Sequence, residues 1–172
     1  ACTSPSLNVE SVDSGVAQTK ECATLKDHVI CDFPAVNRLG ETPNLSDLYG
    51  SPIVLDLSAM WCGPCKAAAS NLQDAADSLP DVTFLTVLIE NTAGQPPEPS
   101  DLASWSSDYS ITSEPVWGSS REIISSDPTE MKDHLYLAGW PTFYFIDSKG
   151  TLKEYIRGYD ESAILAIAAE LD

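Results

Sequence analysis

The sequence predicts an α/β domain built on a mixed β-sheet. Two apolar runs, residues 53–57 and 82–89, are typical of strands covered on both faces, and a helical stripe of apolar residues lies between them. A strand, a helix and a second buried strand predict a parallel unit with a right-handed crossover. Near the C-terminus, two more strand patterns flank a tight turn and predict an antiparallel hairpin. We therefore expect a central mixed sheet with helices on both faces.

The segments before the first buried strand are a predicted tether and a lead-in. Residues 1–20 are rich in Ser, Thr and small polar residues without a sustained apolar period, which predicts a flexible N-terminal tether. The domain itself is expected to span residues 21–172. In residues 22–49, short apolar pieces separated by Pro34 and Pro43 predict two short strands and a turn.

The remaining elements follow from periodicity and from turn residues. The first long helix follows Cys62 and ends at Pro80, and its buried stripe comprises Ala68, Leu72, Ala75, Ala76 and Leu79. Residues 91–134 form a less regular insert with one expected helix near 100–109. Residues 142–147 and 151–157 are the hairpin strands, with a turn at 147–150. Asp160 is the predicted cap of a final helix whose buried stripe comprises Ile164, Ile167, Ala168 and Leu171.

Length and charge exclude several classes of protein. The chain has 172 residues, 43% of them hydrophobic, and no apolar run approaches the ~20 residues that span a bilayer. Any link to a membrane is therefore expected to be an anchor. Nine Lys and Arg residues against 26 Asp and Glu residues give a formal charge of −17. Nucleic acid is not an expected partner, because phosphate binding needs clustered cations.

The segment Cys62-Gly63-Pro64-Cys65 lies where the first buried strand meets the helix, and it predicts redox chemistry. A thiol at a helix N-terminus meets unpaired N–H groups and the helix dipole, so we expect Cys62 to have a lowered pKa and to be the attacking thiolate. Cys65, one turn further, would resolve the mixed disulfide. Pro64 suits the first helical turn. Structural zinc is not expected, because no second pair of ligands follows.

The motif Trp61-Cys62-Gly63-Pro64-Cys65, Asp56 in the preceding strand and the segment 139–142 (Gly-Trp-Pro-Thr) resemble the thioredoxin family over about residues 45–172. This resemblance implies the thioredoxin fold, with an N-terminal extension and a central insert. The lead-in and the insert look more narrowly like the TlpA/ResA-like branch, whose members are exported, membrane-tethered thiol-disulfide oxidoreductases related to peroxiredoxins. Peroxiredoxins carry Thr three residues before the reactive Cys, where this chain has Ala59.

The resemblance implies a function and partners. The expected activity is disulfide exchange with protein substrates in the periplasm or another extracytoplasmic compartment, with the protein acting as a reductant, for example in cytochrome c maturation. A membrane thiol-transfer reductase would recharge it. No cofactor is expected besides the Cys62–Cys65 disulfide, and we expect a monomer. The alternatives are a disulfide oxidase or isomerase, a copper metallochaperone that binds its ion through the same cysteines, and a docking module with an incidental redox pair.

Four residues receive roles around the cysteine pair. Asp56 is a carboxylate in an apolar strand, so its pKa should rise, and it would accept the proton of Cys65; the alternative is a structural carboxylate. Pro141, cis in the family, would expose the backbone of Trp140 as an edge for a substrate peptide. Trp61 and Trp140 would form an apolar collar for substrate, together with Gly63 and Pro64, or would belong to the core. The side chains of Ser58, Met60 and Trp140 depart from the usual family residues, which leaves substrate choice and reduction potential open.

The other cysteines and the histidines are assigned by their surroundings. Cys22 and Cys31 are expected to form a structural disulfide, with a second redox relay as the alternative. Cys2 follows Ala1 as in the end of a bacterial lipoprotein signal, so a lipid anchor is expected there, with an incidental thiol as the alternative. One lipidated Cys and two pairs account for all five cysteines. The isolated His28 and His134 are not expected to bind metal.

Overall fold

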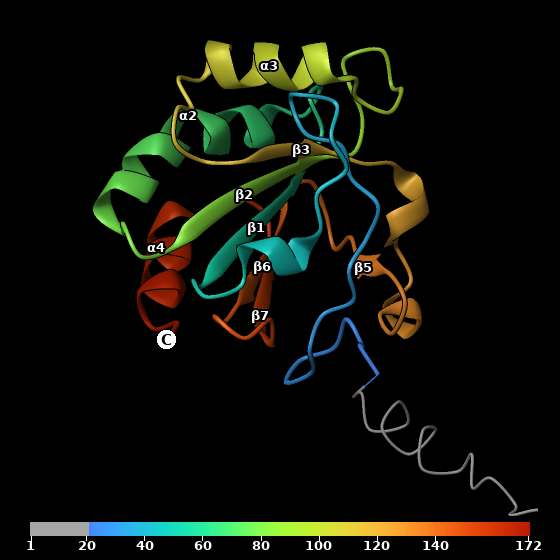
Figure 1. Ribbon diagram of the computed structural model, residues 1–172, viewed down its shortest axis with the longest axis vertical. Helices are drawn as coiled ribbons and strands as arrows, with labels where there is room; N and C mark the ends of the chain where they lie inside the picture. Colours follow the sequence, from blue (N-terminus) through green and yellow to red (C-terminus); the bar gives the residue numbers. More distant parts are fainter. Residues whose placement is uncertain (1–20) are drawn as a thin grey trace, which may run out of the picture.

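A five-stranded mixed sheet organises the computed structural model, which describes residues 21–172 (Figure 1). The strands are β1 (Ile53–Ser58), β2 (Thr83–Leu88), β3 (Val116–Gly118), β6 (Thr142–Ile146) and β7 (Leu152–Arg157), in the order β3-β2-β1-β6-β7. β1 pairs in parallel with β2 and antiparallel with β6, so it lies at the centre with a neighbour on each side. The mixed sheet and the C-terminal hairpin are thus confirmed, and the first buried strand is the central one.

The α-helices of the described residues cover one face of this sheet. They are α2 (Gly63–Ser78), α3 (Pro99–Asp108) and α4 (Glu161–Ala169). Their buried residues form one core cluster with the side chains of the sheet that point to this face, among them Val54, Leu72, Phe84, Leu102 and Ile164. The crossovers β1-α2-β2 and β2-α3-β3 run in the same direction across the sheet. Because crossover connections between parallel strands are right-handed, both helices lie on the same side of the sheet.

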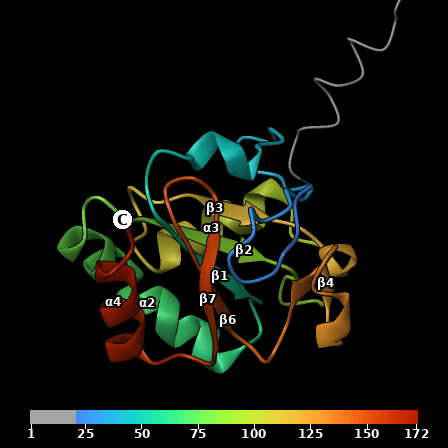
Figure 2. The same cartoon turned by 90° about the horizontal axis from the view of Figure 1, so that it is seen from below.

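On the opposite face, the described residues form only short helical turns and extended segments (Figure 2). It is covered by residues 21–49, which include the 3₁₀ helix η1 (Leu45–Leu48), and by part of the insert. That part contains η2 (Arg121–Ile123), β4 (Ile124–Ser125) and η3 (Pro128–Glu130), and β5 (Leu135–Tyr136) follows directly after the insert. The expectation of helices on both faces is therefore met on this side only by 3₁₀ turns. No helix within residues 21–172 is long and apolar enough to cross a membrane.

The prediction of two short strands in residues 22–49 is wrong. This segment makes only isolated bridges, between Val29 and Thr151 and between Val36 and Gly118. Thr151 precedes β7 and Gly118 ends β3, so the two bridges lie at opposite edges of the sheet. A segment that crosses the strands in this way cannot run alongside any of them, and its apolar residues pack on the sheet instead of pairing with it.

The predicted helix ends agree with the structure. The helix α2 ends at Ser78, just before Pro80, and Asp160 caps α4 by accepting a hydrogen bond from the backbone N–H of Ala163 at 3.1 Å. In the insert, α3 lies at Pro99–Asp108, close to the helix expected near 100–109, and β3 follows it. Residues 1–20, with the expected tether and Cys2, lie outside the described residues.

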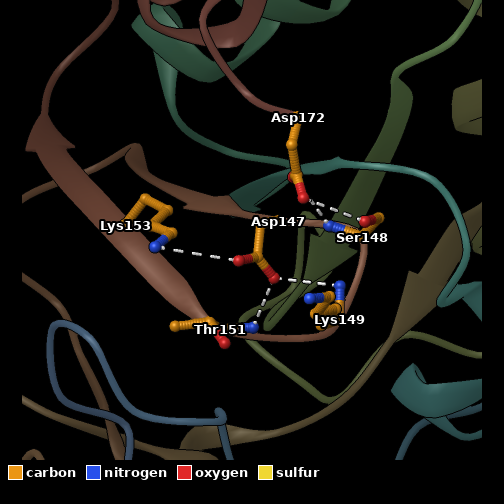
Figure 3. A network of polar contacts seen from close by, with 6 residues as sticks. All are labelled: Asp147, Ser148, Lys149, Thr151, Lys153 and Asp172. Atoms are coloured by element: carbon orange, nitrogen blue, oxygen red, sulfur yellow. Dashed lines mark hydrogen bonds and ion pairs between the residues drawn. The ribbon is translucent and has the colours of Figure 1, made fainter.

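The turn between β6 and β7 is closed by Asp147, which is 7% exposed (Figure 3). Its Oδ1 atom accepts the backbone N–H groups of Lys149 and Thr151, each at 2.9 Å, and its Oδ2 atom lies 3.8 Å from Nζ of Lys153. The backbone N–H and the hydroxyl of Ser148 donate to the carboxylate of Asp172 at 3.2 and 3.1 Å. This network closes the turn of the hairpin and connects it to Asp172, which follows α4.

Replacing Asp147 by Ala is expected to lower the free energy of unfolding by ~1–3 kcal/mol, because two backbone N–H groups of the turn lose a charged acceptor. Asp81→Ala is the matched control: Asp81 is exposed, and its side chain makes no hydrogen bond within residues 21–172. Urea denaturation followed by tryptophan fluorescence measures both variants. Equal midpoints for the two variants would show that the Asp147 network does not stabilise the hairpin.

Candidate functional site

The cysteine pair lies at the junction of β1 and α2. Cys62 is the N-cap residue of α2, and Cys65 lies in its first turn. The two form a disulfide, with their Cα atoms 5.2 Å apart. The Sγ atom of Cys62 accepts a hydrogen bond from the backbone N–H of Cys65 at 3.2 Å. The sulfur of Cys62 thus occupies the place of a helix cap, where N–H groups and the helix dipole favour negative charge.

The two sulfurs differ in their surroundings. Cys62 is 4% exposed and Cys65 is fully buried, and both pack against Ala59 and Trp140. Gly63, between the two cysteines in sequence, is exposed, and a side chain at this position would meet nothing within 4 Å. The open side of the site therefore lies next to Cys62, while Cys65 faces the interior.

The loop before β6 forms one wall of the site. The peptide bond between Trp140 and Pro141 is cis, and the carbonyl of Pro141 accepts the N–H of Gly158 at 2.7 Å. Among residues 21–172, the backbone N–H and carbonyl of Trp140 form no hydrogen bond. A short edge of unpaired backbone groups thus lies beside the disulfide. Such an edge can bind an extended peptide by strand addition.

The two tryptophans of the site contact each other, and Trp140 packs against the cysteines. Their ring centroids are 5.3 Å apart at an interplanar angle of 69°. Trp61 is 43% exposed. Trp140 is half-buried and packs against the cysteines and against the core on the sheet face opposite the α-helices. Trp61 therefore has the exposure expected of a collar residue, and Trp140 combines the two alternatives, collar and core.

Asp56 lies in the middle of β1, on the face covered by α2. It is 3% exposed, and its Oδ1 atom accepts a hydrogen bond from the hydroxyl of Ser58. Burial raises its pKa from an ordinary 3.8 to about 7, and the Ser58 hydrogen bond opposes part of this rise. A cavity beside Asp56 is also lined by Ala68, three residues after Cys65 on α2. Asp56 thus lies beneath the helix whose first turn carries Cys65.

Glu90 and Arg121 are site residues that the sequence did not reveal. The carboxylate of Glu90, 9% exposed, pairs with the guanidinium of Arg121 at 2.5 Å. That guanidinium lies 5.9 Å from the ring centroid of Trp140. The carbonyl of Glu90 accepts the N–H of Met60 at 2.9 Å, just before the cysteine motif. This pair therefore connects the insert to both walls of the site. The one signal in the sequence is a carboxylate directly after a buried strand.

The remaining candidates lie elsewhere. Cys22 and Cys31 form a disulfide with Cα atoms 4.8 Å apart, as the sequence predicted. Their loop bonds to the β6–β7 hairpin: Ile30 N–H donates to the Gly150 carbonyl, and Leu152 N–H to the His28 carbonyl, each at 2.9 Å. These bonds fit a structural role, and the redox alternative stays untested. His134 lies in the insert and, within residues 21–172, is not grouped with other residues that bind metals.

Comparisons with known proteins agree with this geometry. The AhpC/TSA family profile matches residues 27–155, about three quarters of the chain. The thiol-disulfide oxidoreductase ResA of Oceanobacillus iheyensis is 28% identical over 119 residues, which cover 68% of this chain and 55% of ResA. The match to three plant thioredoxins covers 18% to 47% of their lengths, so the chain spans about half or less of these relatives.

Solved structures show the same architecture. The exposed lipoprotein thioredoxin of Streptococcus pneumoniae is 27% identical, with a TM-score of 0.61, over 82% of this chain and all of that one. A secreted disulfide oxidoreductase of Mycobacterium tuberculosis is 22% identical, with a TM-score of 0.59, over 81% of this chain and 96% of that one. The chain therefore belongs to the AhpC/TSA family and is a redoxin with the thioredoxin fold.

Proposed function

We propose that this protein is a thiol-disulfide oxidoreductase that exchanges disulfides with protein substrates through Cys62 and Cys65. The observation that carries the proposal is the position of the Cys62 sulfur, which accepts a backbone N–H at the start of α2 while its partner sulfur is fully buried. This asymmetry supports Cys62 as the attacking thiolate and Cys65 as the resolving thiol.

The exchange takes two steps. In the reduced protein, the thiolate of Cys62 attacks one sulfur of a substrate disulfide, forms a mixed disulfide and releases the other substrate sulfur as a thiolate. Cys65 then gives its proton to Asp56 and attacks the Cys62 sulfur, which closes the Cys62–Cys65 disulfide and releases the second substrate thiolate. Two electrons pass to the substrate, and the released thiolates take protons from solvent. A dithiol partner must reduce the Cys62–Cys65 disulfide before the next cycle.

The substrate would bind along the edge at Trp140. Its unpaired N–H and carbonyl can pair with an extended peptide, and the exposed face of Trp61 adds apolar contact area. Peroxide reduction is less suited to the site. Position 59, where peroxiredoxins carry Thr, is a fully buried Ala that has no hydroxyl to offer a peroxide.

The Cys22–Cys31 disulfide supports a location outside the cytoplasm, because structural disulfides persist in oxidising compartments. The relatives include an exposed lipoprotein and a secreted oxidoreductase. We therefore place the protein in the periplasm or on an extracytoplasmic surface, with Cys2 as the expected lipid attachment. A membrane thiol-transfer protein is the partner we propose for reducing it.

The proposal is tested by single-turnover reduction of a disulfide peptide by the reduced protein. Wild type should release both peptide thiols. Cys65→Ser should stop at a mixed disulfide on Cys62, which intact-mass measurement detects, and Cys62→Ser should be inactive. Release of peptide thiols by Cys62→Ser at the wild-type rate would refute the assignment.

The direction of electron flow is tested by the reduction potential of the Cys62–Cys65 pair. Tryptophan fluorescence across thiol/disulfide buffers reports it, because Trp61 precedes Cys62 and its ring contacts Trp140, which packs against the cysteines. A reductant should have a potential near or below about −270 mV. A value of about −120 to −180 mV would instead indicate an oxidase or isomerase.

Asp56→Asn is expected to slow resolution by about 10²-fold while leaving the attack by Cys62 nearly unchanged, because only the second step needs a base for Cys65. Stopped-flow measurement of mixed-disulfide formation and decay separates the two steps. Ser148→Ala, in the distant hairpin turn, is the control. A decay rate for Asp56→Asn equal to that of the control would remove Asp56 from the mechanism.

Asp56 should also make stability depend on pH. Its pKa is about 7 in the folded protein and near 3.8 unfolded, so the folded protein binds the proton more tightly. Its contribution to stability therefore falls as pH rises from about 4 to about 7 and is constant above that. Relative to wild type, oxidised Asp56→Asn should gain up to ~4 kcal/mol between pH 4 and pH 8. A difference in unfolding free energy that is the same at both pH values would contradict the raised pKa.

A further inference from the structure

Two arginines lie beside the loop that contains Trp140. Arg121 belongs to the central insert, and Arg157 is the last residue of β7. The guanidinium of Arg121 lies 5.9 Å from the ring centroid of Trp140. The exchange steps described above use neither arginine, so their position beside the substrate edge calls for another role.

Arg157 lies against the backbone of Gly139, the residue before Trp140. A Cβ atom at Gly139 would lie 2.6 Å from Nε and 3.0 Å from Cγ of Arg157, so glycine at this position leaves room for the arginine. The next residue of the chain, Gly158, donates its N–H to the Pro141 carbonyl at 2.7 Å. The end of β7 is thus joined to the cis-proline loop.

Both arginines are on the sheet face opposite the α-helices. Tyr155 packs in the core of this face, and Ile156 packs in the core of the helical face. Because side chains alternate along a strand, Arg157 points to the same face as Tyr155. Trp140 packs on this face too, and the insert that carries Arg121 covers part of it. The two guanidinium groups and the Trp140 ring therefore share one face of the sheet.

Both guanidinium groups have N–H donors to offer to a ligand. Arg157 is exposed, and its side chain forms no hydrogen bond or ion pair with residues 21–172. The side chain of Arg121 is 60% exposed, and its only hydrogen bond in that part of the chain runs from Nη2 to Glu90. Each arginine can therefore bind a further carboxylate without breaking a contact of the described chain.

The acidic residues close to these arginines in sequence are engaged elsewhere. Glu154, three residues before Arg157, pairs with Lys26 at 3.2 Å. Asp160 caps α4 through its side chain. Glu122 lines a separate cavity beside the structural disulfide. The charge of Arg157 is thus left unpaired by its sequence neighbours.

We propose that Arg121 and Arg157 determine substrate specificity by binding a carboxylate side chain that lies within about two residues of the reactive cysteine of a substrate peptide. This recognition rests on the proposed function, disulfide exchange with peptides bound along the Trp140 edge. An extended peptide advances about 3.3 Å per residue, so the neighbours of its cysteine come within reach of side chains that flank the edge. A guanidinium binds a carboxylate through parallel N–H···O bonds, which a neutral amide does not replace.

The charge of the whole chain predicts the opposite preference. With 9 basic and 26 acidic residues, its long-range field attracts cationic peptides and repels anionic ones. Salt screens this field beyond about 8 Å at physiological ionic strength, whereas contacts with the arginines act at shorter range. Local recognition is therefore separated from the overall charge by comparing variants on the same peptide.

The test measures the rate constant for reduction of disulfide-linked peptide dimers by the reduced protein in about 0.15 M salt. The cysteine of each peptide is flanked by Glu, by Gln or by Lys. Each rate for a variant is divided by the wild-type rate for the same peptide, which cancels differences in intrinsic reactivity among the peptides.

Arg157→Gln is the main variant, because its side chain makes no hydrogen bond or ion pair in the described part of the chain. The double variant Glu90→Gln, Arg121→Gln removes both partners of the ion pair and leaves the net charge unchanged. Lys149→Gln is the control: Lys149 is exposed in the distant hairpin turn (Figure 3), and its substitution changes the charge as Arg157→Gln does.

Arg157→Gln and the double variant should each reduce the Glu-flanked peptide roughly threefold to fivefold more slowly than wild type, because a charged contact is lost. The Gln-flanked peptide should be reduced at a nearly unchanged rate. Arg157→Glu should reverse the preference, slowing the Glu-flanked peptide about tenfold and accelerating the Lys-flanked one. Lys149→Gln should leave all the rates close to those of wild type.

Equal relative losses on the Glu-flanked and Gln-flanked peptides would overturn the recognition, because the arginines would then only hold the cis-proline loop. A selective loss of the same size in Lys149→Gln would also overturn it, since overall charge would explain the effect.

The outcome is separable from the proposed function. If wild type reduces the Gln-flanked peptide and the arginine variants show no selective loss, disulfide exchange is retained and only the recognition is wrong. If wild type reduces none of the peptides, disulfide exchange itself fails, and the recognition fails with it.

Discussion

The hydrogen bond from the Cys65 N–H to the Cys62 sulfur is the contact on which the site depends. It exists because the chain leaves a central strand and begins a helix within a few residues. β1 has a neighbour on each side and is buried along its whole length, so its C-terminal end is fixed in position. The helix α2 is held on the sheet by an apolar face, so its first turn cannot move away from that end. The reactive sulfur therefore occupies a rigid cap position.

The same junction has a cost. A carboxyl group in the middle of β1 occupies a place where an apolar side chain would add stability, and burial keeps its pKa near neutrality. The structure offsets part of this cost with the Ser58 hydroxyl, which donates a hydrogen bond to the carboxyl group. Such local conflicts between stability and chemistry are common at functional sites. In this protein the residue concerned is Asp56, which lies beneath α2, the helix that carries Cys65.

Local patterns predicted most of the fold and the centre of the site. The central strands, α2 and α4 carry their own periodicity and caps, and the cysteine motif and Asp56 are adjacent in sequence to those signals. The strands predicted in residues 22–49 do not form, because the apolar residues of this segment pack across the face of the sheet. The alternation of apolar and polar residues along a segment does not show whether it pairs with a strand or crosses the sheet. The Glu90–Arg121 pair and the Asn71–Tyr159 bridge join segments 31 and 88 residues apart. Their partners become visible only when the fold brings them together.

The most direct measurement of the central claim is the pH dependence of alkylation of the reduced protein, with the modified residue located by mass spectrometry. The structure predicts that Cys62 reacts first, with an apparent pKa well below the ordinary thiol value of about 8.5, while buried Cys65 stays unmodified in the folded protein. Modification of both cysteines at similar rates, or a pKa for Cys62 near that of a free thiol, would contradict it. The helix cap would then not be what makes this cysteine pair reactive.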